Sequence, residues 1–259
     1  MLSQLLFTWN PWILPAGFVV VLMLAIDLPA RFGRKLVSRD HLDDNTWNVV
    51  QGGIVALVAF MLGISFSQSE GRFDARRGLV VTEANAIGTT WLRADQLPGV
   101  QAARFRALLT DYTATRLHAY ESQLSPDDLQ EAQSRSDAEQ AQLWSLASGA
   151  LRASPHDLGR SLLVASLNDT IDVSAEQLAA LTHHVPTTIV FLTLVLVIIG
   201  AALIGFSFAR AGESPQVLAL AYVLVCVLVV EMIVDLDRPQ SGFVRVNLDP
   251  IKIQLSSMR

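Results

Sequence analysis

PTTIVFLTLVLVIIGAALIGFSF, residues 186–208, is a stretch of 23 residues without a charged side chain. As a helix it spans about 35 Å at about 1.5 Å per residue, which is enough to cross the apolar core of a bilayer, about 30 Å thick. The composition of the whole chain agrees, because 17% of its residues are charged whereas soluble domains carry about 25%. We therefore predict a membrane-spanning helix here, with lipid as the solvent for part of the chain.

Three further stretches meet the length and polarity criteria of spanning helices, although less cleanly. Residues 217–234 (VLALAYVLVCVLVVEMIV) are interrupted only by Glu231. Residues 49–67 (VVQGGIVALVAFMLGISFS) give about 28 Å of helix. Residues 12–28 (WILPAGFVVVLMLAIDL) are short and contain a proline and an aspartate, but aromatic anchors such as Trp9 precede them. We predict four transmembrane helices in two hairpins.

A long polar region separates the hairpins, and its apolar residues recur at helical spacing throughout. Its first piece continues the second span directly, since no helix breaker precedes Pro98. Ser125-Pro126 and Ser154-Pro155 each pair an N-cap hydroxyl with a proline, a helix start signal, and Ser174 with Gln177 resembles a capping box.

No strand alternation occurs, so we predict an all-α, multi-pass membrane protein with a water-exposed helical domain between spans two and three. The predicted parts are a transmembrane hairpin at residues 1–67, a helical domain at 68–185, a second transmembrane hairpin at 186–237 and a C-terminal tail at 238–259.

The excess negative charge lies in the middle region. Residues 67–185 carry 15 acids and 10 bases, and the rest of the chain carries nine of each. Nucleic-acid binding needs a basic patch, so we expect no nucleic-acid partner. The arginines and lysines on the two sides of the predicted membrane number five and six, which leaves the orientation open.

The second span has a large apolar face on which Val58, Leu62 and Phe66 recur at i, i+4 and i+8, with Ser65 and Ser69 nearby. An apolar face that runs into serines could form the hydrophobic constriction of a pore. Contact with lipid or with another subunit would explain the same spacing.

Charges of both signs follow this span within about two helical turns, at Arg72, Asp74, Arg76 and Arg77. They could set the electrostatics of a pore mouth, or they could pair at i+3 and i+4 on a solvated helix face. Glu231 lies inside the fourth span, where a charge at mid-bilayer costs about 2.5–3.5 kcal/mol on insertion scales. We expect it to face protein or water, on an ion path or beside a structural partner.

The chain carries none of the metal, nucleotide or hydrolase motifs by which catalytic sites are recognised. His183 and His184 are adjacent, so on a helix they point about 100° apart and cannot chelate one ion as a pair. We expect no enzyme activity, no cofactor and no metal.

Three segments resemble the blocks of the bacterial bestrophin-like domain family. They are LGISFSQSEGRFDARRGLVVTEANAIGTTWLRADQLP, SLNDTIDVSAEQLAALTHHVP and DLDRPQSGFVRV, at residues 62–98, 166–186 and 235–246. The resemblance implies a homo-oligomeric, pentameric ion channel in the bacterial inner membrane, whose pore is lined by the second span. It further implies that Val58, Leu62 and Phe66 form the pore neck, and that both termini and the middle domain are cytoplasmic.

The partners implied are the lipid bilayer, further copies of the chain, and inorganic ions of undetermined sign. An acidic middle domain would concentrate cations, whereas the arginines after span two would favour anions. The alternative is a non-conducting membrane scaffold or sensor whose cytosolic helical domain binds a partner. In that case the same apolar faces pack between subunits.

Overall fold

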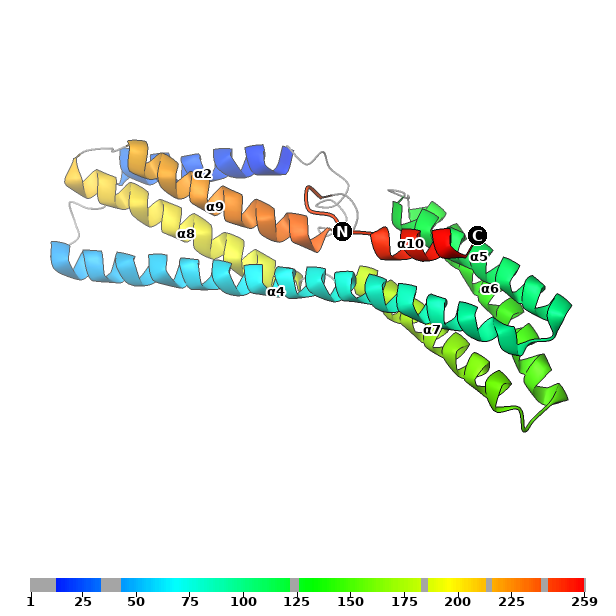
Figure 1. Ribbon diagram of the computed structural model, residues 1–259. Helices are drawn as coiled ribbons and strands as arrows, with labels where there is room; N and C mark the ends of the chain where they lie inside the picture. The colour runs from blue at the N-terminus through cyan, green and yellow to red at the C-terminus, as the bar shows by residue number, and fades with distance from the viewer. Residues whose placement is uncertain are drawn as a thin grey trace. The chain divides into compact units, whose positions relative to one another are not determined.

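The computed structural model describes residues 13–33, 43–121, 126–182, 186–212, 216–238 and 242–258. Within these ranges all regular structure is helical (Figure 1), as predicted. The chain divides into two compact units. We call residues 1–72 and 184–238 the apolar unit, and residues 73–183 and 239–259 the polar unit.

Among its described residues, the apolar unit holds four helices that are long and apolar enough to cross a membrane, and each overlaps one predicted span. The prediction of four candidate spans is therefore confirmed, while Trp9 and Trp12 lie outside the described residues. The helices are α2 (Ile13–Phe32), the first part of α4 (Asp44–Arg93), α8 (Thr187–Ala211) and α9 (Gln216–Asp237).

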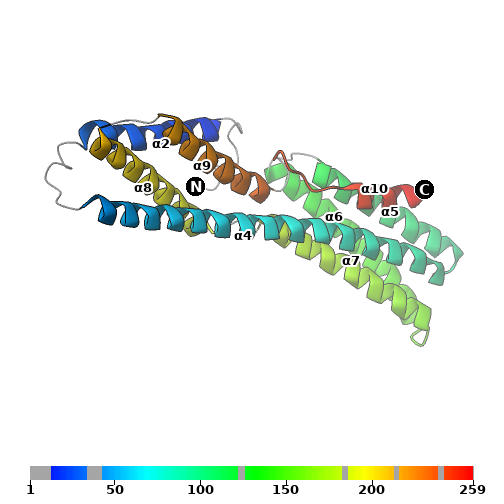
Figure 2. The ribbon, with the colours of Figure 1, turned by 60° about the vertical axis from the view of Figure 1, so that its left-hand side comes forward.

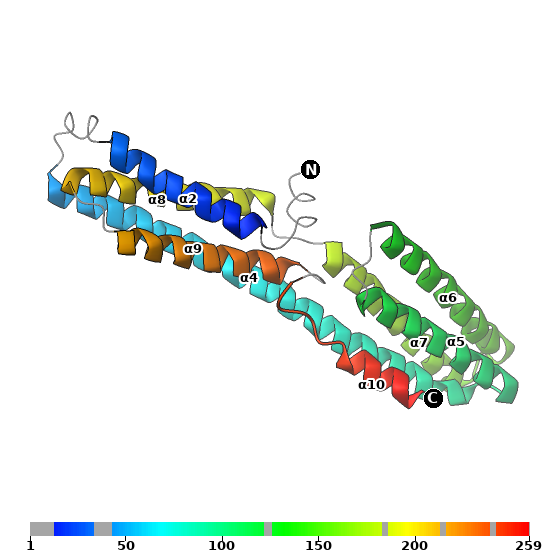
Figure 3. The same ribbon diagram turned by 90° about the horizontal axis from the view of Figure 1, so that it is seen from above.

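Side chains from all four helices share one core in the apolar unit. Helix α2 packs on α8 and α9, and α8 contacts α9 (Figures 1 and 3). A Cβ atom at Gly205 of α8 would collide with the backbone of Ile26 on α2, so only glycine permits this close approach. Helix α8 ends at Gly212, whose left-handed φ of 71° lets its N–H reach the Phe208 carbonyl at 3.0 Å.

The polar unit contains the second part of α4 and five further elements. Helix α6 packs on both α5 and α7, and α10 packs on α5 (Figure 2). A core of fully buried side chains, including Phe105, Leu109 and Leu163, holds the unit together. The elements are the 3₁₀ turn η1 (Ala94–Gln96), α5 (Gly99–Glu121), α6 (Pro126–Ala153), α7 (Leu158–Thr182) and α10 (Asp249–Ser257).

Helix boundaries confirm some start signals and correct others. Helix α4 is unbroken over 50 residues and ends just before η1, as the lack of breakers predicted. Helix α6 begins at Pro126 as expected. The predicted start at Ser154 is wrong by three residues, because Asp157 is the side chain that accepts the Arg160 backbone N–H, at 3.1 Å.

The capping box at Ser174 and Gln177 is also a wrong prediction, because both residues lie inside α7. Both side chains are buried instead. The predicted domain bounds, with a C-terminal tail at 238–259, stay a prediction. Within that segment α10 places Ile251 in a buried cluster with Val80 and Ala84 of α4.

Candidate functional site

The structure brings the three predicted neck residues together on one face of α4, and this face points into the apolar unit. Val58 and Leu62 are only 2% and 7% exposed. They belong to a core cluster that also contains residues of α2, α8 and α9, and Phe66 packs against it. The role of these residues as a pore neck stays a prediction, but their side chains lie inside one chain rather than projecting from it.

The opposite face of α4 is open. Two residues along a helix correspond to a turn of about 200°, so Phe60 points away from the core that holds Val58 and Leu62. Phe60 is 61% exposed. Ala56, Gly63 and Ser67 lie on the same exposed stripe, at helical spacings of three and four residues.

The two predicted serines follow the buried face rather than the open one. Ser65 is buried and its hydroxyl lies 3.0 Å from the Thr193 hydroxyl on α8. Ser69 is fully buried, and its hydroxyl has no hydrogen-bond partner among the described residues. Both serines therefore contribute to packing within the chain.

The predicted charges after the second span separate into buried and exposed members. Arg76 is 2% exposed, and its Nε donates to the Ala180 carbonyl on α7 at 3.2 Å. Arg72 is half-buried, whereas Asp74 and Arg77 are exposed. Glu231 is half-buried on α9, and its expected contact with protein or water stays a prediction.

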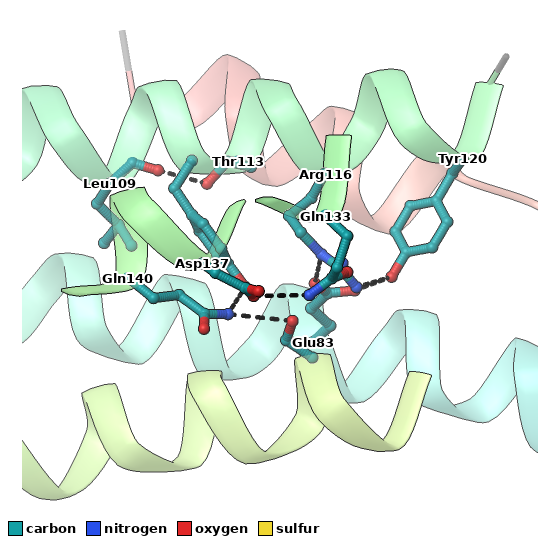
Figure 4. A network of polar contacts seen from close by, with 10 residues as sticks. Glu83, Leu109, Thr113, Arg116, Tyr120, Gln133, Asp137 and Gln140 are labelled. Atoms are coloured by element: carbon teal, nitrogen blue, oxygen red, sulfur yellow. Dashed lines mark hydrogen bonds and ion pairs between the residues drawn. The ribbon is translucent and has the colours of Figure 1, made fainter. Parts of the chain in front are cut away.

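A buried ionic cluster in the polar unit was not predicted. The Arg116 Nε donates to Glu83 Oε1 at 2.7 Å, and the Tyr120 hydroxyl donates to Glu83 Oε2 at 2.6 Å (Figure 4). Arg116 also donates to the Tyr120 oxygen at 2.5 Å. Glu83 is on α4 and is 0% exposed, while its two partners are on α5. No local motif connects residues so far apart in sequence, so the sequence carried no signal for the cluster.

Burial and charge set the protonation of this cluster. Burial disfavours the charged guanidinium, but the charge of Glu83, the two tyrosines Tyr120 and Tyr112 and the hydrogen bond to Glu83 together outweigh this effect and raise the pKa of Arg116. Burial, followed by the Glu83 charge, raises the pKa of Tyr120 well above its usual value. The cluster is therefore an ion pair with a neutral tyrosine that donates to the carboxylate.

A second polar contact ties α5, α6 and α7 together. Gln140 on α6 donates from Nε2 to the Tyr112 hydroxyl at 3.3 Å and to the Ser174 hydroxyl at 3.1 Å. Burial raises the pKa of Tyr112. Among the described residues no group of three His, Cys, Asp or Glu side chains could hold a metal ion.

Four long apolar helices in one unit and a helical polar unit in the same chain define an α-helical integral membrane protein. The bestrophin-like domain family matches residues 16–251, and the chain belongs to this family. The resemblance inferred from three sequence blocks is thereby confirmed.

Solved structures show the same fold. The crystal structure of a bacterial bestrophin homologue from Klebsiella pneumoniae superposes with a TM-score of 0.66 at 18% sequence identity, covering 94% of this chain and 96% of that chain. A single-residue variant of that homologue superposes with a TM-score of 0.66 at 17% sequence identity, covering 94% of this chain and 97% of that chain. The crystal structure of a membrane protein variant superposes with a TM-score of 0.67 at 16% sequence identity, covering 94% of this chain and 98% of that chain. No curated protein sequence matches the chain significantly.

Proposed function

We propose that the protein is a homo-oligomeric ion channel of the bacterial inner membrane, with five copies of α4 around the pore. Family membership and the likeness to the Klebsiella bestrophin homologue support this proposal. The polar unit and both termini lie on the cytoplasmic side in this arrangement.

The observation that carries the proposal is the open apolar stripe on α4, defined by Ala56, Phe60, Gly63 and Ser67. A pore-lining side chain has to project away from the core of its own subunit. Phe60 does so with 61% of its surface exposed, and it is flanked by small residues that let neighbouring copies of α4 approach closely.

We therefore move the proposed constriction from the predicted neck to Phe60. Five phenylalanine rings at one level would form a hydrophobic barrier that ions cross only when it is hydrated or widened. Val58 and Leu62 lie on the other face of α4 and pack it against the core of the apolar unit.

Ion flux from liposomes that contain the purified oligomer distinguishes the two positions proposed for the constriction. K⁺ and Cl⁻ gradients are applied separately. Phe60→Ala should raise the flux several-fold. Leu62→Ala removes a buried side chain and should mainly lower stability, by about 2–5 kcal/mol. The ion that moves in wild-type protein gives the selectivity, for which the exposed Asp74 and Arg77 have opposite effects.

Each alternative predicts a different result in the same experiment. If Leu62→Ala and Phe66→Ala raise the flux while Phe60→Ala does not, the neck is the one first predicted from spacing. If neither wild type nor any variant conducts in a well-folded oligomer, the protein is a non-conducting scaffold or sensor.

A further inference from the structure

The polar unit contains a cavity of about 320 Å³ between α4, α5, α7 and the segment that leads into α10. This volume falls in the range of small-molecule sites. One part of the lining is apolar, with Val80, Leu181, Val246 and Leu248. The polar and aromatic part consists of Arg76, Gln177, Arg245, Lys252, Glu121 and Tyr120.

The charge of this lining is opposite to that of its surroundings. Three cations and one acid line the cavity, whereas residues 67–185 as a whole have five more acids than bases. Lys252 and Glu121 neutralise each other, because Nζ lies 2.6 Å from Oε1. Arg76 and Arg245 also line the cavity, and the Arg245 guanidinium gives it a positive charge.

These guanidinium groups are held by backbone carbonyls. Arg76 donates from Nε to Ala180 at 3.2 Å, and Arg245 donates from Nε to Gly242 at 3.3 Å. No carboxylate pairs with Arg245 in the part of the chain that the structure describes. The Arg245 guanidinium, held by Nε, keeps its terminal N–H groups in a fork that suits carboxylate and phosphate oxygens.

Gln177 adds an independent indication of a ligand. It lines the cavity, is 1% exposed, and its Nε2 has no hydrogen-bond partner among the described residues. A buried donor without a partner costs free energy, and an anion in the cavity would remove that cost.

We propose that this cavity binds a small organic anion, whose carboxylate or phosphate group is held by Arg245 and Gln177. The apolar part of the ligand packs against Val80, Val246 and Leu248. This site belongs to the polar unit alone, so it is independent of where the constriction lies and of whether the protein conducts.

Isothermal titration calorimetry on the full-length oligomer tests the proposal. Butyl phosphate and hexanoate serve as probes, and butylamine serves as a cation of similar size. The wild type should bind the two anions and not the amine. Arg245→Gln should weaken binding about tenfold or more, as expected for the loss of a charge-assisted hydrogen bond.

Arg104→Gln is the matched control, because Arg104 is an exposed arginine of the same unit that does not line the cavity. Its affinity should equal that of the wild type. Equal affinity in Arg245→Gln and Arg104→Gln, or no binding of either anion by the wild type, would overturn the proposal.

Gln177→Leu separates ligand binding from folding. It removes the unpartnered amide and keeps a side chain of similar size, so the unliganded protein should be as stable as wild type or more so. Anion affinity should nevertheless fall. Unchanged affinity in this variant would overturn the role given to Gln177.

The anionic group could belong to a soluble molecule or to a lipid headgroup. Dioctanoyl phosphatidic acid carries the same phosphate as butyl phosphate on a longer apolar part. Tighter binding of the lipid by the wild type, lost in Arg245→Gln, would identify a headgroup site. Equal affinity for the two phosphates would identify a site for a soluble anion.

Discussion

Glu83, Arg116 and Tyr120 place a full ion pair inside the polar unit, with side chains that are 0% and 6% exposed for the two charged members. Replacing one partner of such a pair leaves a buried charge uncompensated, at about 3–5 kcal/mol. The cluster joins α4 to α5, and Tyr120 also lines the cavity. The cluster therefore holds Tyr120, one of the residues that line the proposed anion site, in place.

Because of the Tyr120 hydroxyl, we expect the folded protein to lose stability at alkaline pH. The pKa of this hydroxyl in the folded protein is raised well above the usual value, mainly by burial and next by the charge of Glu83. In the unfolded chain its pKa is about 10. Above that pH the unfolded chain releases the proton first, so stability falls as pH rises.

Tyr120→Phe should reduce this loss, because it removes the titrating group. We expect a smaller decrease in melting temperature between about pH 9 and about pH 11 than in wild type. Thermal unfolding of the purified protein followed across this range checks the prediction. An identical decrease in both proteins would contradict the protonation state assigned to the cluster.

At the scale of elements, the contact between α2 and α8 depends on Gly205. A Cβ atom there meets the carbonyl and Cα of Ile26. These are backbone atoms, so no side-chain rotation can relieve the overlap. The two helices have to separate to accommodate even a methyl group.

Gly205→Ala should therefore destabilise the apolar unit by about 1–3 kcal/mol, the usual cost of overpacking. Gly17→Ala on α2 is the control, because a Cβ at Gly17 meets nothing within 4 Å, and it should be neutral or stabilising. Melting temperatures of the two variants in the same detergent check this. A Gly205→Ala protein as stable as Gly17→Ala would show that α2 and α8 do not approach closely.

At the scale of the whole molecule, the proposed pore exists only in an assembly, because one chain leaves Phe60 on an open face. We expect the purified protein to be a homo-oligomer of about five copies, in which this face is closed by symmetry. Native mass spectrometry measures the number of subunits. A monomer that remains folded would contradict the channel proposal and leave the anion site untouched.

The helical elements were predictable because they depend on local sequence. Long apolar stretches predict α8 and α9, and the absence of helix breakers predicts the unbroken course of α4. The start of α7 was misplaced because Ser154 and Asp157 both carry capping side chains, and only the observed hydrogen bond to Arg160 distinguishes them. Ser174 was misread for the same reason, since a capping box within a helix has the same local sequence as one at its start.

Hydropathy, helical period and motif order are local or linear properties. The amino-acid sequence was therefore enough to predict a helical protein, four segments that suit a bilayer, and the family. Which face of α4 is buried depends instead on tertiary packing. Val58 and Phe60 are both apolar and only two residues apart, and the helices that pack on α4 come from distant parts of the chain. The cavity likewise depends on tertiary structure, because it joins Arg76, Gln177 and Arg245 from separate segments whose meeting no local pattern encodes.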